Sequence, residues 1–138
     1  MLNDLCKKWM KSAQNDLIVI QSLIDQIQNP RHRPQEQIMY HSQQAAEKML
    51  KAFLFQQGIA IHGHDLTVLR NKCATYDNAF NQKRMTDHCS FLSGFNIARY
   101  IDYTGDVDKI TADRAWNSAK RIFDFVSERL GLDKHFFR

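Results

Sequence analysis

The stretch that decides the fold reads Tyr40-His41-Ser42-Gln43-Gln44-Ala45-Ala46-Glu47-Lys48-Met49-Leu50-Lys51-Ala52. Successive residues of an α-helix are rotated by about 100°, so this stretch sorts into two faces. The apolar face carries Ile38, Ala45, Met49, Ala52 and Phe53, and the opposite face carries Tyr40, Gln44, Glu47 and Lys51 within roughly 60°. Such a helix can pack against a core on one side and hold a ligand, a partner or a charge network on the other.

Helix-breaking residues bound this segment on both sides. Pro30 and Pro34 precede it, and Gly58, which can adopt the left-handed closing conformation, follows it. The sequence therefore predicts a helix from Gln35 to Gln57. Before the prolines, apolar residues recur every three or four positions from Leu2 to Ile27, which predicts a long amphipathic first helix.

The second half of the chain predicts three further helices. Asp65 is a suitable N-cap for a short helix over residues 66–73, a fourth helix covers 81–103, and a fifth opens at Asp108 or Thr111 and closes before Gly131. No stretch has the pattern of a strand. We therefore expect an all-α fold, an antiparallel up-and-down four-helix bundle with one short extra helix, that forms a single domain over residues 1–138.

Composition fits one compact domain of a cytoplasmic protein. Of the 138 residues, 43% are hydrophobic and 25% are charged. The three cysteines are an odd number without CxxC spacing, which favours a reducing compartment over a disulfide framework. We expect neither a signal peptide nor a membrane span. The formal charge of +4 is spread along the chain and gives slight support to nucleotide, RNA or acidic partners.

One carboxylate falls on the apolar stripe of the first helix. Asp16 shares that stripe with Trp9 and Ile20, so its side chain is expected to face inward. A buried carboxylate needs a cation or several hydrogen-bond donors, and Arg99 and Lys51 are the first candidates. A structural ion pair and a ligand-facing acid both remain open.

The polar face of the central helix has two interpretations. Glu47 precedes Lys51 by four residues, and this order of acid before base favours a solvated ion pair on a helix surface. Such a pair contributes only about a few tenths of a kcal/mol. Alternatively, Gln43, Gln44 and Lys48 beside Tyr40 offer amides, charge and an aromatic plane suited to a base or a phosphate.

Signals for a metal, a cofactor or a common enzyme class are weak or absent. His62, His64 and Asp65 lie close together, but His-x-His without further ligands is a poor metal signature, and we expect no metal and no cofactor. The sequence has no GxxxxGK[ST], GxGxxG, HExxH or GxSxG motif. The cysteines are interpreted as small core residues.

Four groups of residues together resemble the HEPN family, the higher eukaryote and prokaryote nucleotide-binding domain. They are Trp9 with Ala13, Asp16 and Leu17; the run from Gln43 to Ala52; His64-Asp65-Leu66 with Leu69; and Ala98-Arg99-Tyr100. The resemblance spans roughly residues 9 to 129. It implies a four-helix up-and-down bundle with a short extra helix, frequent homodimers, and frequent pairing with a small nucleotidyltransferase.

Catalytic members of this family are ribonucleases, commonly toxins, that carry an Arg and a His separated by four to six intervening residues, usually with a polar residue just after the Arg. Arg84 and His88 have three intervening residues, and Arg33 and His41 have seven. Arg129 and His135 have five, but Leu130 and Gly131 follow the Arg directly. About one match is expected by chance in such a sequence, the usual weakness of short motifs.

The sequence therefore supports one main hypothesis and two alternatives. The main one is a non-catalytic, cytoplasmic, homodimeric HEPN-like domain that binds a nucleotide and/or a nucleotidyltransferase partner, in a toxin-antitoxin type of pair. Its ligand-binding residues would be Asp16, Gln44, Glu47, Lys48, Lys51 and Arg99. The first alternative is a metal-independent ribonuclease toxin that uses Arg129 and His135. The second is a protein scaffold.

Overall fold

The computed structural model describes residues 1–29, 31, 34–94 and 107–132. In this part of the chain all regular structure is helical, and no strand is present. The elements, in chain order, are α1 (Asp4–Ile24), the 3-10 helix η1 (Asp25–Gln28), α2 (Gln35–Gln56), α3 (Leu66–Ala74), the 3-10 helix η2 (Asn78–Asn81), α4 (Lys83–Ser93) and α6 (Lys109–Arg129).

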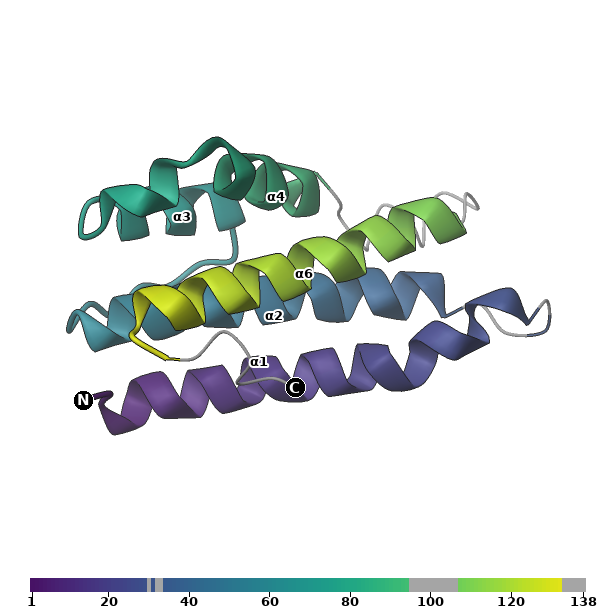
Figure 1. Cartoon of the computed structure of the whole chain (residues 1–138), viewed down its shortest axis with the longest axis horizontal. Helices are drawn as coiled ribbons and strands as arrows, with labels where there is room; N and C mark the ends of the chain where they lie inside the picture. Colours follow the sequence, from purple (N-terminus) through teal and green to yellow (C-terminus); the bar gives the residue numbers. More distant parts are fainter. Residues whose placement is uncertain (30, 32–33, 95–106, 133–138) are drawn as a thin grey trace.

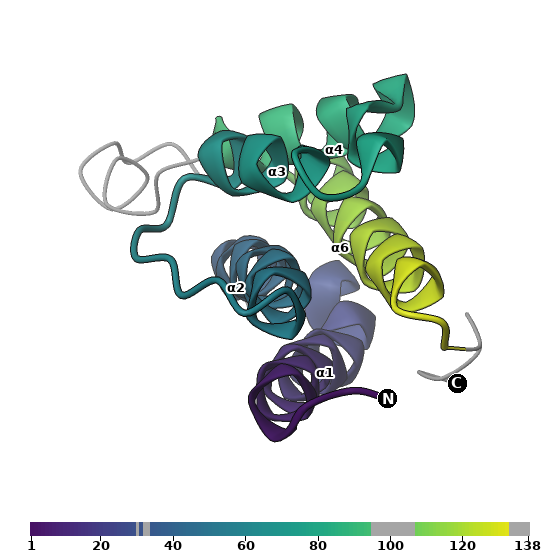
Figure 2. The ribbon, with the colours of Figure 1, turned by 90° about the vertical axis from the view of Figure 1, so that its left-hand side faces the viewer.

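The long helices form an antiparallel up-and-down bundle (Figure 1). Helix α2 runs back along α1, α4 runs against α2, and α6 runs back along α4. The short α3 lies beside α4 and forms with it a layer over α2 and α6, seen end-on in Figure 2. The predicted fold, four antiparallel helices plus one short helix, is confirmed.

Local sequence sets the ends of the helices. The side chains of Asn3, Asp65 and Asp108 accept hydrogen bonds from backbone amides in the first turns of α1, α3 and α6, respectively. Such caps satisfy amides that have no partner inside the helix. After α2 and α6 the chain turns at Gly58 and Gly131, whose φ angles of 78° and 82° lie in the left-handed region that glycine favours. The predicted starts and stops of α2, α3 and α6 therefore hold to within one or two residues.

Two predicted helices differ from the observed ones. The first was expected to continue to Ile27, but the α-helix ends at Ile24 and η1 covers the remaining residues. The fourth was expected from Asn81, but α4 begins at Lys83 because Asn78–Asn81 forms η2. The predicted continuation of that helix over 95–103 lies outside the described residues.

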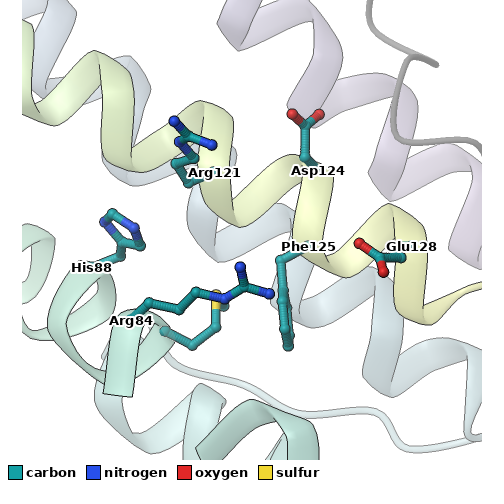
Figure 3. Close-up of a pocket in the computed structure, with 7 residues that line it drawn as sticks. Arg84, His88, Arg121, Asp124, Phe125 and Glu128 are labelled. Atoms are coloured by element: carbon teal, nitrogen blue, oxygen red, sulfur yellow. The ribbon is translucent and has the colours of Figure 1, made fainter. Parts of the chain in front are cut away.

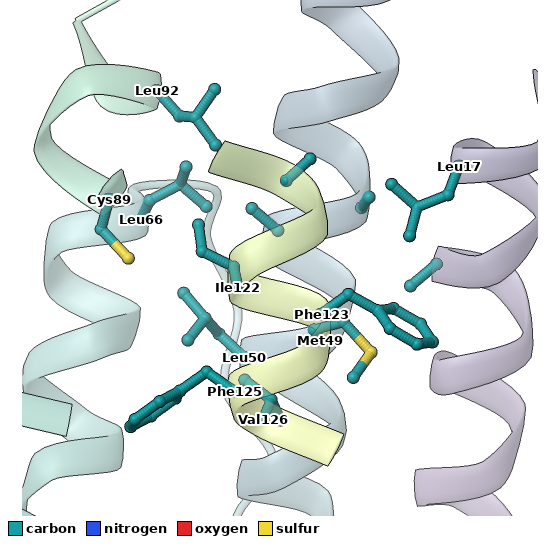
Figure 4. Close-up of a cluster of buried hydrophobic side chains, with 14 of the residues drawn as sticks. Leu17, Met49, Leu50, Leu66, Cys89, Leu92, Ile122, Phe123, Phe125 and Val126 are labelled. Carbon is teal, nitrogen blue, oxygen red and sulfur yellow. The ribbon is translucent and has the colours of Figure 1, made fainter. Parts of the chain in front are cut away.

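Helix α2 occupies the centre of the molecule. It packs against α1, α6, α3 and α4, so buried residues are found on several of its sides. Figure 4 shows Met49 and Leu50 of α2 beside Ile122, Phe123 and Val126 of α6. Burial of this apolar surface is the main stabilising contribution to the fold.

All three cysteines are free and fully buried, as the sequence predicted for core residues. Burial raises the pKa of the Cys6 thiol to about 11 and that of Cys89 to about 12, and it raises the pKa of Cys73 as well. No described helix is both long enough and apolar enough to cross a membrane.

Candidate functional site

The carboxylate of Asp16 holds α1 and α2 together. Asp16 is 7% exposed, which confirms its inward direction. Its Oδ1 lies 2.7 Å from Nδ1 of His41, and its Oδ2 accepts a 2.7 Å hydrogen bond from Nζ of Lys48. Lys51, one of the two cations expected to pair with Asp16, pairs with Glu47 instead, so that expectation was wrong. The other expected cation, Arg99, lies outside the described residues.

A second charged cluster lies along α2. Glu47 accepts a 3.2 Å hydrogen bond from Nζ of Lys51, and its other oxygen lies 3.0 Å from Nδ1 of His64 in the α2–α3 connection. Nζ of Lys51 also lies 5.5 Å from the ring centroid of Trp9. The prediction of a solvated surface pair was wrong, because Glu47 and Lys51 are each only 6% exposed. Helix α1 covers this flank of α2.

Five of the six proposed ligand-binding residues thus lie on α1 and on one flank of α2. Asp16, Glu47, Lys48 and Lys51 form two internally neutralised clusters, and Gln44 is half-buried on the same flank. Both lysines already donate to carboxylates, so a phosphate would have to compete with a partly buried ion pair at Lys48 and a buried one at Lys51.

The residues of the ribonuclease alternative are divided between described and undescribed parts of the chain. Arg129 makes a two-pronged ion pair with Asp77, through Nε to Oδ2 at 2.6 Å and Nη2 to Oδ1 at 3.1 Å. This ion pair ties the end of α6 to the N-cap of η2. His135 lies outside the described residues.

The described residues contain no group of three or more His, Cys, Asp or Glu side chains placed to hold a metal ion. His64 instead pairs with Glu47, and Asp65 caps α3, as the sequence predicted for Asp65.

A hollow of about 350 Å³ lies between α4 and α6 (Figure 3). Arg84, Met85 and His88 of α4 line one side of it. The other side is formed by four residues of α6, namely Arg121, Asp124, Phe125 and Glu128. The guanidinium of Arg84 packs over the ring of Phe125, 5.6 Å from its centroid. Facing helices therefore present cations, an imidazole, an aromatic ring and carboxylates to one pocket.

His88 of the pocket lies between α4 and α6. Its Nδ1 lies 3.0 Å from the hydroxyl oxygen of Ser118 on α6. Burial lowers the pKa of His88, and the nearby positive charges of Arg121, Arg114 and Arg84 lower it further, while Asp87 acts in the opposite direction. The imidazole is therefore neutral near pH 7.

Comparison with known proteins identifies the family. The sequence profile of the HEPN domain matches residues 6–130. This chain belongs to the HEPN family. The crystal structure of an archaeal HEPN homologue superimposes on this HEPN domain with a TM-score of 0.67 and 26% sequence identity, covering 91% of this chain and 97% of the other. No curated protein matches the sequence.

Sequence reasoning missed the pocket of this HEPN domain. Arg84 and His88 were considered only as a ribonuclease motif with too short a spacing. Their four-residue separation nevertheless places both side chains on one face of a helix. Arg121, Phe125 and Glu128 follow the same rule on α6, so a search for polar and aromatic residues at helical spacing could have found both walls.

Proposed function

We propose that this HEPN domain is a nucleotide-binding module that holds a phosphate of its ligand between α4 and α6. The observation that supports this proposal is that Arg84 and Arg121 line one pocket together with the neutral imidazole of His88. Arg84 and Arg121 bring two guanidinium groups to the same pocket, and an anion there would interact favourably with both positive charges. Arginine also suits phosphate because its planar fork can donate two hydrogen bonds at once.

The size of the pocket agrees with a small ligand. Its volume of about 350 Å³ is near the lower end of the range usual for small-molecule sites, about 300 to 1,000 Å³. Phe125 contributes an aromatic wall.

The flank of α2 is the less favourable location for a phosphate. Lys48 and Lys51 are paired with Asp16 and Glu47, and an anion would have to displace those carboxylates from mostly buried positions. Arg84 and Arg121 instead line an open pocket between α4 and α6, to which Asp124 and Glu128 also contribute. The proposed site therefore moves from the residues that the sequence suggested to the second pair of helices.

Calorimetric titration with ADP and GDP tests the proposal. We expect binding by the wild-type protein, and a loss of about tenfold or more in affinity for Arg121→Gln and Arg84→Gln, since each removes a charge-assisted hydrogen bond. Arg31→Gln, which changes an exposed arginine at a turn, is the matched control. Lys51→Gln should leave the affinity unchanged, and the opposite pattern would place the ligand on the flank of α2.

A nucleotidyltransferase subunit or a second HEPN chain is the proposed protein partner, as the family resemblance implies. The N-terminal part of α1 favours a protein contact because Leu5, which is 45% exposed, lines a hollow with Lys7, Lys8 and Lys11. Light scattering of the purified protein distinguishes a dimer from a monomer. Co-purification from the native host tests for the heterologous subunit, and a monomer without partners would contradict this part of the proposal.

A further inference from the structure

The charge of the α4–α6 pocket changes sign along its length. Arg121 and His88 lie at one end, and Glu128 lies two helical turns further along α6 (Figure 3). Seven residues of helix correspond to about 10 Å, so one small molecule can reach both ends. Arg84 reaches from α4 toward Phe125, between the two ends.

Each end of the pocket selects a different chemical group. The guanidinium of Arg121 can only donate hydrogen bonds, and the ligand group beside it must accept them, as phosphate oxygens do. The carboxylate of Glu128 only accepts at neutral pH, so the ligand group beside it must donate. In a nucleotide the strongest candidates for that donor are the 2′- and 3′-hydroxyls of the ribose, which carboxylates bind in other nucleotide sites.

The same charge reversal disfavours a nucleic-acid strand. A strand carries a phosphate on every nucleotide, so a chain that continued past Arg84 would bring its next phosphate toward Glu128. Like charges at close range are repulsive, most of all where water is partly excluded. A single nucleotide places only its uncharged sugar at that end.

We infer that the ligand of this pocket is one ribonucleotide, bound with its phosphate beside Arg121 and His88 and its ribose hydroxyls beside Glu128. This inference rests on the proposed function, because it assigns the ligand class and its direction in the same pocket.

Titration calorimetry with ADP, 2′,3′-dideoxy-ADP and an eight-residue oligoadenylate tests the inference. The wild-type protein should bind ADP about tenfold more tightly than the dideoxy analogue, the lower range for a hydrogen bond to a charged group. In Glu128→Gln this preference should fall to about twofold or less. Glu36→Gln, the same substitution on α2, should keep the wild-type preference, and circular dichroism should show both variants folded.

The outcomes separate this inference from the proposed function. Equal binding of ADP and the dideoxy analogue would overturn the inference and leave the proposed function intact. Tighter binding of the oligoadenylate than of ADP, lost in Arg121→Gln, would also overturn it and would assign a nucleic-acid strand to the pocket. An absence of binding by ADP, GDP and the oligoadenylate would overturn both.

Discussion

Individual charged residues in this domain differ in how well they are satisfied. Asp16 has two cationic or polar partners from α2, whereas Arg84 and Arg121 line an open pocket together with His88. A satisfied cluster stabilises a fold, and an unbalanced one is a site that a ligand can complete. At the residue scale, structural and binding roles are therefore separable by experiment.

The ion pair between Lys48 and Asp16 should contribute measurably to stability. Lys48→Ala leaves the Asp16 carboxylate, which is mostly buried, with only His41, and we expect a loss of about 1–3 kcal/mol in the free energy of unfolding. Urea denaturation followed by circular dichroism measures this loss. Lys11→Ala on the exposed side of α1 is the control, and an equal effect of both substitutions would show that the pair is not stabilising.

His88 should titrate below the ordinary histidine pKa of about 6.5. Because the folded state binds this proton less readily than the unfolded state, the group destabilises the fold as the pH falls below about 6.5. Nuclear magnetic resonance of the imidazole measures the pKa directly. Arg121→Gln should raise it, and bound ADP should raise it as well, since both reduce the positive potential at the ring. A pKa unchanged by ADP would argue against a phosphate beside His88.

At the scale of the helix, the sequence predicted the elements well but not their environments. Prolines, glycines and capping residues act through the local backbone, so Pro34, Gly58 and Asp65 located helix ends correctly. The exposure of Glu47 and Lys51 depends on which helices surround α2, and helical periodicity alone cannot supply that information. A polar face on a central helix is enclosed, and its charges pair with one another.

The candidate site also combines features that the local sequence predicts with features that depend on helix packing. Asp16 was correctly placed inward because its position on α1 is a local property. Its partners, and the pocket between α4 and α6, result from the packing of helices that are distant in sequence. Antiparallel pairing of α4 with α6 brings His88 to Ser118 and Arg84 to Phe125, and neither contact has a sequence signal of its own.

The ion pair of Arg129 with Asp77 should make the junction of α6 and η2 sensitive to acid. Partial burial alone would raise the pKa of Asp77, but hydrogen bonds from Arg129 and from the Ala79 amide lower it below its ordinary value. The stabilisation is therefore present above about pH 4 and is lost as the pH falls through the lowered pKa. Asp77→Asn should remove this part of the acid dependence of the melting temperature. If the melting temperature of Asp77→Asn falls with acid as it does in the wild type, the acid sensitivity does not come from this ion pair.

At the scale of the whole molecule, the bundle provides two separate seams. The seam of α1 and α2 is closed by ion pairs, and the seam of α4 and α6 is open at a pocket. Binding at the open seam would hold α4 against α6 and would thereby favour the complete bundle over any unfolded state.

A saturating nucleotide should therefore raise the melting temperature. At a ligand concentration of about 100 times Kd, binding adds about 2.7 kcal/mol to the stability of the folded state. For a domain of this size that corresponds to a rise of about 10 °C, measurable by differential scanning calorimetry. Arg121→Gln should lose most of the rise at the same ADP concentration. A full rise in that variant would place the ligand elsewhere.

The three buried sulfhydryl groups can also report on local opening of the helices. Cys6, Cys73 and Cys89 lie in α1, α3 and α4, respectively, so each one reports on a different helix. A chromogenic alkylating or disulfide reagent should leave all three intact until the helix around them opens, because access and the thiolate form are both suppressed in the native state. Mass spectrometry of the order in which they are tagged would then reveal which helix detaches first.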